Sequence, residues 1–227
     1  MAHPWQTIGK SANEDNVIEL RKRGDRDFLL LVNGRVLMNS SANRSEVTLG
    51  AHACRLVADR PKPRVLIGGL GMGFTLRAAL DALPGSAEVV VAELNPVIVE
   101  WCCGPLGGLT QNAVKDPRVT VETDDVAAVI IGASLKGANR FDAIIIDLYV
   151  GPGADTEPHY DPFYGSLALS TTADALSPGG VFAVWGENPD TAFEKRLVAA
   201  GFTFERLRPG RGGLRHVVYI AQKKRMK

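Results

Sequence analysis

The chain has 227 residues, of which 45% are hydrophobic and 22% are charged, a composition typical of folded globular proteins. Its 26 lysines and arginines nearly balance its 25 aspartates and glutamates, which excludes a global positive field for holding nucleic acid or an anionic membrane. No apolar run approaches the roughly 18 residues that cross a bilayer, and the first ten residues lack the pattern of a secretion signal. We therefore expect a cytoplasmic protein with no nucleic-acid or membrane partner.

The length predicts one α/β unit of about 150 to 170 residues with a smaller appendage. We place the appendage in residues 1–60, as a small β-hairpin segment. Runs at 28–32 and 35–38 are separated by Asn33-Gly34, a hairpin signal because both residues tolerate the positive φ of a type I′ turn. A helix is predicted next, with four residues spaced to share one apolar face: Val47, Ala51, Cys54 and Ala58.

From residue 61 to 227 strands alternate with helices. Runs of Val and Ile without polar alternation indicate a mostly parallel sheet covered on both faces, so the fold class is α/β and doubly wound. The runs are residues 65–67, 88–92, 118–121, 141–146 and 181–185. Residues 177–180 are predicted to be a tight turn before the last run. The tail, 201–207 and 216–221, has no intervening helix and predicts an antiparallel hairpin at the sheet edge.

The three cysteines predict no disulfide and no metal site. Cys54, Cys102 and Cys103 are odd in number, and two of them are adjacent. That spacing belongs neither to a disulfide framework nor to a tetrahedral zinc site. We expect reduced, mostly buried thiols, with a vicinal redox pair at Cys102 and Cys103 as the alternative.

Candidate ligand-binding residues lie where the strands end, because an open parallel sheet brings its carboxyl ends to one crevice. After the first strand, the glycines at 69, 71 and 73 permit a tight turn and close approach of a ligand, with close packing of helix on strand as the alternative. Glu93 ends the next strand, where a carboxylate can accept hydrogen bonds from ribose hydroxyls. Asp125 could accept from an adenine amino group or cap a helix.

The nucleoside could belong to a nicotinamide dinucleotide or to a sulfonium such as S-adenosylmethionine. The dinucleotide pattern G-x-G-x-x-G fails, because Phe74 stands where the third glycine is needed. The antiparallel tail also fits a dehydrogenase poorly. Both observations favour the sulfonium.

These residues resemble the spermidine synthases, or polyamine aminopropyltransferases, a family with the class I methyltransferase fold. The resemblance runs from about residue 28 to residue 221 and implies a seven-stranded sheet, with Glu93 as the ribose acid, Asp125 on the adenine side and Asp147 as the first acid of a D-S-x-D-P loop. Several stretches carry it: Asn33-Gly34-Arg35-Val36-Leu37 (family D-G-x-x-Q), residues 69–77 (G-G-G-D-G-G-T-L-R), Asp116-Pro117-Arg118-Val119 (D-P-R-V), Phe163-Tyr164 (F-Y) and Pro178-Gly179-Gly180 (P-G-G).

The sequence departs from the family at four points. Met72 replaces the acid that meets the donor's ammonium, and a thioether cannot neutralise an ammonium. Leu37 replaces a donor-side glutamine. After Asp147 the second acid of the loop is missing, and of the family's Y-H-E trio only Glu46 is kept.

The loop after Asp147 offers replacements for the missing base. An attacking amine must be neutral, so a carboxylate or imidazole must accept its proton. The candidate catalytic residues are Asp147, Tyr149, Asp155 and His159, and the donor-binding candidates are Gly69, Gly71, Met72, Gly73, Glu93 and Asp125. Arg211 and Arg215 in the tail could hold an acidic acceptor or face solvent.

We therefore expect a transferase whose donor is S-adenosylmethionine or its decarboxylated form and whose acceptor is a small molecule, an amine by resemblance. Catalysis would consist mainly of aligning donor and acceptor. The resemblance favours aminopropyl transfer, whereas the loss of two acids favours methyl transfer. A protein that binds the nucleoside without catalysis, as a sensor or partner subunit, also remains open. The resemblance implies a homodimer.

Overall fold

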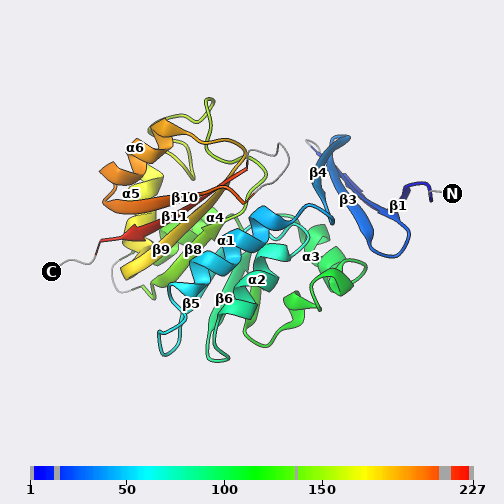
Figure 1. Ribbon diagram of the computed structural model, residues 1–227, viewed down its shortest axis with the longest axis horizontal. Coiled ribbons are helices and arrows are strands. Elements are labelled where there is room, and N and C mark those ends of the chain that lie inside the picture. Colours follow the sequence, from blue (N-terminus) through cyan, green and yellow to red (C-terminus); the bar gives the residue numbers. More distant parts are fainter. Residues whose placement is uncertain (1–2, 13–15, 136–137, 210–215, 225–227) are drawn as a thin grey trace.

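The computed structural model describes residues 3–12, 16–135, 138–209 and 216–224. They form a four-stranded antiparallel sheet followed by a seven-stranded, mostly parallel sheet with helices on both faces (Figure 1). The predicted fold class is confirmed.

The N-terminal sheet has the strand order β1-β2-β3-β4. Asn33 and Gly34 join its last two strands with φ of 50° and 76°, which confirms the turn predicted from this dipeptide. The strands are β1 (Gln6–Ala12), β2 (Val17–Arg23), β3 (Asp27–Val32) and β4 (Arg35–Asn39).

The large sheet has the order β10-β11-β9-β8-β5-β6-β7, in which β11 alone runs antiparallel to its neighbours. Every residue of β8 is buried, which explains the apolar run at residues 143–146. The tail strands form the predicted antiparallel hairpin, with β10 at the edge. The strands are β5 (Arg64–Gly68), β6 (Glu88–Ala92), β7 (Val119–Glu122), β8 (Phe141–Ile146), β9 (Leu176–Gly186), β10 (Phe202–Leu207) and β11 (Val217–Lys223).

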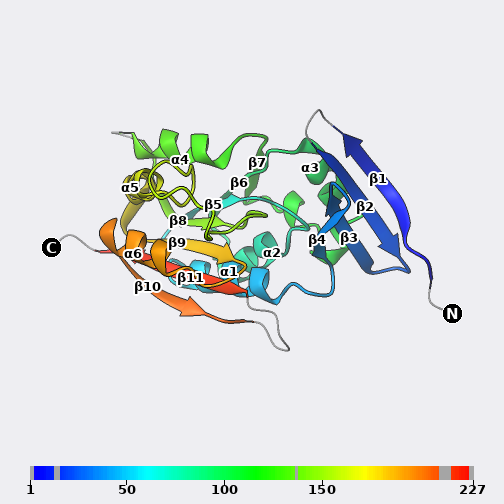
Figure 2. The same ribbon diagram turned by 90° about the horizontal axis from the view of Figure 1, so that it is seen from above.

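Helices cover the two faces of this sheet, as Figure 2 shows for α4 and α5 above and α1 below. Alternate strand residues enter two cores: Ile67 and Ile145 face the side of α1 to α3, whereas Leu66 and Ile144 face the side of α4 to α6. The helices are α1 (Arg44–Arg55), α2 (Phe74–Ala82), α3 (Pro96–Cys103), α4 (Val126–Ser134), α5 (Ser166–Ala175) and α6 (Thr191–Ala199), with short 3-10 helices η1 (Gly107–Leu109) and η2 (Ala113–Lys115).

Helix α1 buries only part of the predicted face. Cys54 is buried as predicted, but Val47 is 42% exposed, and Glu46, Leu49 and Ala53 are buried instead. The polar Glu46 therefore belongs to the inward face, which a search for apolar spacing overlooks. The helix packs against α2 and the large sheet, although it falls within residues 1–60; a domain boundary at residue 60 stays a prediction.

The tight turn predicted at residues 177–180 is not a separate turn after a helix. Strand β9 already begins at Leu176, directly after α5. Its pairing with β8 jumps from Leu176 opposite Phe141 to Val181 opposite Ala143. Residues 177–180 are thus an irregularity inside the strand, because the backbone resumes the ladder on both sides of them.

Candidate active site

The carboxyl ends of β5 and β8 lie side by side at the centre of the sheet. From β5 the chain continues to β6 on one side, whereas β8 leads to β9 on the other. Such a switch point opens the crevice in which open α/β sheets bind ligands. The glycine turn (residues 69–73) follows β5 and Asp147 follows β8, and the Asp147 amide donates to the Gly68 carbonyl at 2.9 Å. The structure therefore brings these predicted residues together.

The glycines of the turn allow neighbouring parts of the chain to pack closely against it. Gly69 and Gly71 have φ of +88° and +52°, in the region that favours glycine. A Cβ on Gly71 would lie 2.6 Å from the sulfur of Met38 on β4, and one on Gly69 would collide with the Asp147 carbonyl. Strand β4 of the N-terminal sheet thus lies directly against the turn.

Met72 points into the core and is fully buried. Beside it in the turn, the Gly71 carbonyl accepts a hydrogen bond from the Cys102 thiol at 3.3 Å. Burial raises the pKa of that thiol to about 12, so it stays protonated and can keep donating. Met72 therefore acts here as core packing, and its role toward a donor stays a prediction.

Glu93, predicted to bind ribose, is 7% exposed and braces the turn. Its two oxygens accept from the amides of Leu70 at 2.9 Å and Asn95 at 2.8 Å. Each carboxylate oxygen has about two lone-pair sites, so each keeps one for a further donor. The residue is thus fixed in place and still able to accept.

Asp125 is the N-cap of α4, where its Oδ1 accepts from the Ala127 amide at 2.9 Å. One of the two roles considered for this residue is therefore present in the structure. The side chain is exposed, and its adenine role stays a prediction.

Asp147 lies against α1 and α2, where the Thr75 hydroxyl donates to its Oδ2. Burial and the nearby charge of Glu46 raise the pKa of this carboxyl to about 7, although the Thr75 hydrogen bond opposes the rise. Gly50 permits the close approach of the two helices, because a Cβ there would lie 3.1 Å from the Ala79 amide nitrogen. The fold thus gives Asp147 the proton affinity of a general base near neutral pH.

Three residues outside the predicted site lie near this acid: Thr75 contacts Asp147 directly, whereas Ser45 and His216 are connected to it only through Glu46. The Ser45 hydroxyl donates to Glu46 Oε2 at 2.6 Å and lies 3.1 Å from His216 Nδ1. Thr75 could have been identified from the sequence, because it lies within the stretch that resembles the family's glycine turn. No signal pointed to His216, since 171 residues separate it from Ser45.

The structure does not bring the loop candidates to Asp147 through any hydrogen bond among the described residues. Tyr149 is 50% exposed and Asp155 is also exposed. His159 Nδ1 lies 2.8 Å from the Ser166 hydroxyl at the start of α5, a contact that organises the loop. Arg211 and Arg215 lie outside the described residues.

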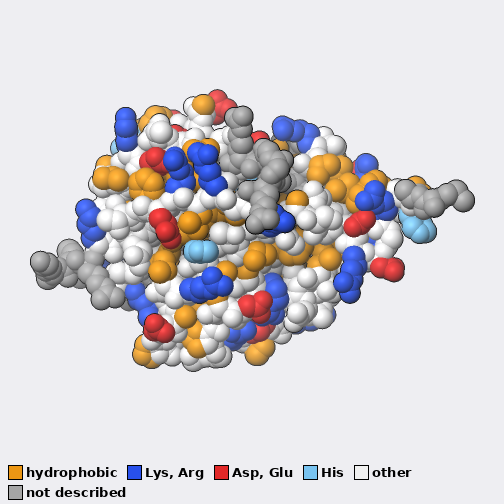
Figure 3. Space-filling model, viewed as in Figure 1, with side chains coloured by type: hydrophobic (Ala, Val, Ile, Leu, Met, Phe, Trp, Pro, Cys, Tyr) orange, Lys and Arg blue, Asp and Glu red, His pale blue; other side chains and the backbone are white. Residues whose placement is uncertain are grey.

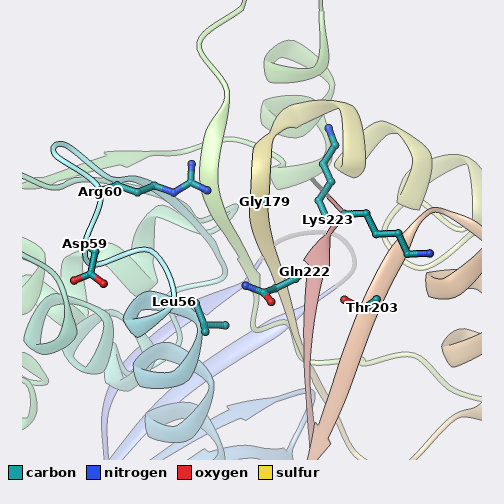
Figure 4. Close-up of a pocket in the computed structure, with 8 residues that line it drawn as sticks. Leu56, Asp59, Arg60, Gly179, Thr203, Gln222 and Lys223 are labelled. Atoms are coloured by element: carbon teal, nitrogen blue, oxygen red, sulfur yellow. The ribbon is translucent and has the colours of Figure 1, made fainter. Parts of the chain in front are cut away.

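A hollow of about 530 Å³ lies at the opposite end of the sheet, where the parallel strands begin (Figure 4). It contains none of the predicted site residues. Arg60 on its wall already pairs with Asp142 and the Pro178 carbonyl, and Lys223 Nζ donates to the carbonyls of Ala173 and Leu176. The hollow is lined by Leu56, Asp59, Arg60, Gly179, Thr203, Gln222, Lys223 and Lys224.

On the face drawn in Figure 3, Lys and Arg side chains are interspersed with Asp and Glu. Within the described part of the chain, no helix has the length and apolar character needed to cross a membrane. Over the same residues, no three or more His, Cys, Asp or Glu side chains gather in a way that could hold a metal ion.

Comparison with known proteins bears on both sequence and fold. No family model matches the chain. The polyamine aminopropyltransferase of Mycobacterium tuberculosis is 31% identical over 188 residues, which are 83% of this chain and 34% of that protein. The enzyme of the same name from Shewanella oneidensis is 29% identical over 192 residues, covering 77% and 32%. The chain thus spans about a third of the length of the curated relatives it matches.

Solved spermidine synthases share the fold. The Thermotoga maritima enzyme superposes with a TM-score of 0.73 at 21% identity, covering 96% of this chain and 73% of that one. A spermidine synthase in complex with the transition-state analogue AdoDATO gives the same TM-score at 20% identity, covering 96% and 72%. In sequence and in fold the chain is therefore spermidine synthase-like, with the class I S-adenosylmethionine-dependent methyltransferase fold.

Proposed function

We propose that this chain is a transferase that moves an aminopropyl group from decarboxylated S-adenosylmethionine to a small amine. The placement of Glu93 and Asp147 around the glycine turn at the switch point carries the proposal. The names of the relatives support it: they are polyamine aminopropyltransferases, one of them 31% identical over 83% of this chain.

Glu93 and the glycine turn would hold the adenosine of the donor. Each oxygen of Glu93 keeps a lone pair after binding its backbone amide, which fits two ribose hydroxyls. At Asp125, Oδ1 caps α4 and Oδ2 is left to accept from an adenine amino group. The residues present therefore fit an adenosine donor.

Asp147 would accept the proton of the attacking amine. The amine nitrogen forms a bond to the carbon beside sulfur, the carbon–sulfur bond breaks, and its electron pair stays on sulfur, which becomes a neutral thioether. The nitrogen then carries the positive charge and releases a proton to the Asp147 carboxylate. A carboxyl with a pKa of about 7 is matched to this transfer near neutral pH. Tyr149, Asp155 and His159 stay candidates for contacts made from the loop.

Met72 makes the choice of donor the point to test. A buried thioether cannot pair with the ammonium of an aminopropyl group, so another group must meet that ammonium. The relatives' names lend no support to methyl transfer or to binding without catalysis, and both are outcomes of the experiment.

The test compares S-adenosylmethionine and its decarboxylated form by titration calorimetry, then incubates the tighter ligand with diamines. We expect tighter binding of the decarboxylated donor and the release of methylthioadenosine with an aminopropylated diamine. Glu93→Gln should weaken both donors about tenfold, the loss expected when a charged hydrogen-bond acceptor is neutralised, and the exposed His3→Ala serves as an unchanged control.

Three other results would contradict the proposal. Preference for the carboxylated donor with transfer of a methyl group would make the chain a methyltransferase. Tight binding without turnover on any acceptor would favour a sensor or partner subunit. If neither donor bound, the proposal that the chain binds a sulfonium would be wrong.

A homodimer and a cytoplasmic location stay predictions. Light scattering of the purified chain would measure the first, and fractionation of the source cells the second.

A further inference from the structure

His216 lies beside the candidate site and contacts it through one residue. The half-buried imidazole precedes β11, packs edge-on against Trp185 with ring centroids 5.1 Å apart, and places Nδ1 3.1 Å from Ser45 Oγ. Ser45 is 4% exposed and donates to Glu46 Oε2 at 2.6 Å. A continuous chain of contacts therefore joins the tail of the protein to the first turn of α1.

The direction of this chain follows from counting protons. A serine hydroxyl has a single proton, and that of Ser45 is donated to Glu46. The Nδ1 of His216 must then carry a hydrogen and donate it to Ser45 Oγ. This order differs from that of a serine nucleophile, whose hydroxyl donates to the imidazole, so the group orients Glu46 and does not activate Ser45.

Glu46 in turn acts on Asp147. Thr75 joins the two residues, since its hydroxyl donates to the Asp147 carboxylate and lies 3.4 Å from the backbone carbonyl of Glu46. Among the described residues, no lysine or arginine comes within ion-pair distance of either acid. An ionised Glu46 therefore raises the proton affinity of Asp147 without a neighbouring cation to cancel its charge.

We propose that His216 is a positioning residue of the transfer: through Ser45 it holds the ionised Glu46 beside Asp147, and Glu46 keeps Asp147 ready to accept the proton of the attacking amine. The inference rests on the proposed function.

Carbon-13 titration of the carboxyl groups tests the geometry without needing turnover. Ser45→Ala removes the hydrogen bond to Glu46 and His216→Ala removes the donor behind it, so both should lower the pKa of Asp147 by about half a unit to one unit, the size of a weakened like-charge interaction. His216→Asn, whose amide nitrogen can take the place of Nδ1, should restore the wild-type value. The exposed His3→Ala is the matched control.

Titratable groups from several elements lie along this chain of contacts: His216 before β11, Glu46 on α1 and Asp147 after β8. Tyr164 before α5 also interacts with Asp147, and its pKa is raised by burial and by the charges of Asp161 and Asp147.

Kinetics supply the second readout. In His216→Ala the acidic limb of the pH profile of kcat should move to lower pH, kcat should fall about threefold to tenfold because the base is weaker, KM should change little, and His216→Asn should recover both. Folded Ser45→Ala and His216→Ala proteins with an unchanged Asp147 pKa would overturn the inference. A wild-type protein inactive with every diamine would count instead against the proposed function, and the titration would still decide the role of His216.

Discussion

The Thr75 hydroxyl is the one hydrogen-bond donor to the Asp147 carboxylate among the described side chains, and it lowers the pKa that burial and Glu46 raise. Replacing it should therefore push the pKa of Asp147 further above 7. We expect Thr75→Val, which keeps the shape and removes the hydroxyl, to move the acidic limb of kcat upward by about one unit. The pH dependence of transfer measures this shift.

Thr75→Ser is the matched control, because it keeps the hydroxyl and removes a methyl group. Its pH profile should coincide with that of the wild type. A shift of equal size in both variants would mean that packing and not the hydrogen bond tunes Asp147.

The same carboxyl makes stability depend on pH. Its pKa is raised from 3.8 to about 7 in the folded chain, so the folded state binds the proton more tightly than the unfolded state does. The stabilisation that protonation of Asp147 gives the folded state is complete below the unfolded pKa and is lost as pH rises through 7. The free energy of unfolding falls by at most about 4 kcal/mol over this range. Asp147→Asn cannot ionise and should be inactive yet more stable than the wild type at about pH 8, and less so at about pH 5. Thermal unfolding of both proteins across this pH range checks the prediction. A difference in stability between them that does not change with pH would count against the raised pKa of Asp147.

At the scale of an element, α4 begins at a residue with two candidate tasks. Asp125 caps the helix in the structure, and its second oxygen is proposed to meet adenine. Serine caps a helix about as well as aspartate but is shorter, so Asp125→Ser should keep the melting temperature and lose affinity for the donor. Asp125→Ala should lose both, with about 1 kcal/mol of stability removed. Calorimetric titration measures donor affinity and thermal unfolding measures stability, so together they separate the two tasks. Unchanged donor binding in both variants would mean that Asp125 only caps the helix.

The helices and strands could be predicted from the sequence where their buried residues are apolar. The run at residues 143–146 is apolar and wholly buried in β8, so its composition indicated a central strand. The inward face of helix α1 was predicted only in part, because Ser45 and Glu46 are buried on it and polar residues give no signal in apolar periodicity. Residues at strand ends, such as Glu93 and Asp147, were predictable from topology. The partnership of Ser45 and His216 was not, since it forms only when the tail returns to the sheet beside α1.

At the scale of the whole molecule, the buried residues of β2 and β3 share one hydrophobic core with α1 to α3, and two close contacts at glycines add to this packing. Met38 on β4 lies against Gly71 of the glycine turn, and Gly9 on β1 lies against the Trp101 ring on α3. Trp101 is 8% exposed, so the sheet covers it from solvent. The position of this sheet therefore determines where Met38 lies relative to the glycine turn that is proposed to hold the donor.

Gly9→Val tests that attachment. An added Cβ at Gly9 would lie 2.7 Å from two ring atoms of Trp101, and a stiff side chain against a buried ring forces the sheet outward at a cost of about 1–3 kcal/mol. We expect a lower urea midpoint, a Trp101 emission shifted to the red because water reaches the ring, and weaker donor binding because Met38 moves off the turn. Gly85→Ala is the control, since nothing lies within 4 Å of a Cβ there, and it should change none of the three. If Gly9→Val lowered stability while donor affinity stayed at the wild-type value, the N-terminal sheet would be a structural cover with no part in shaping the donor site.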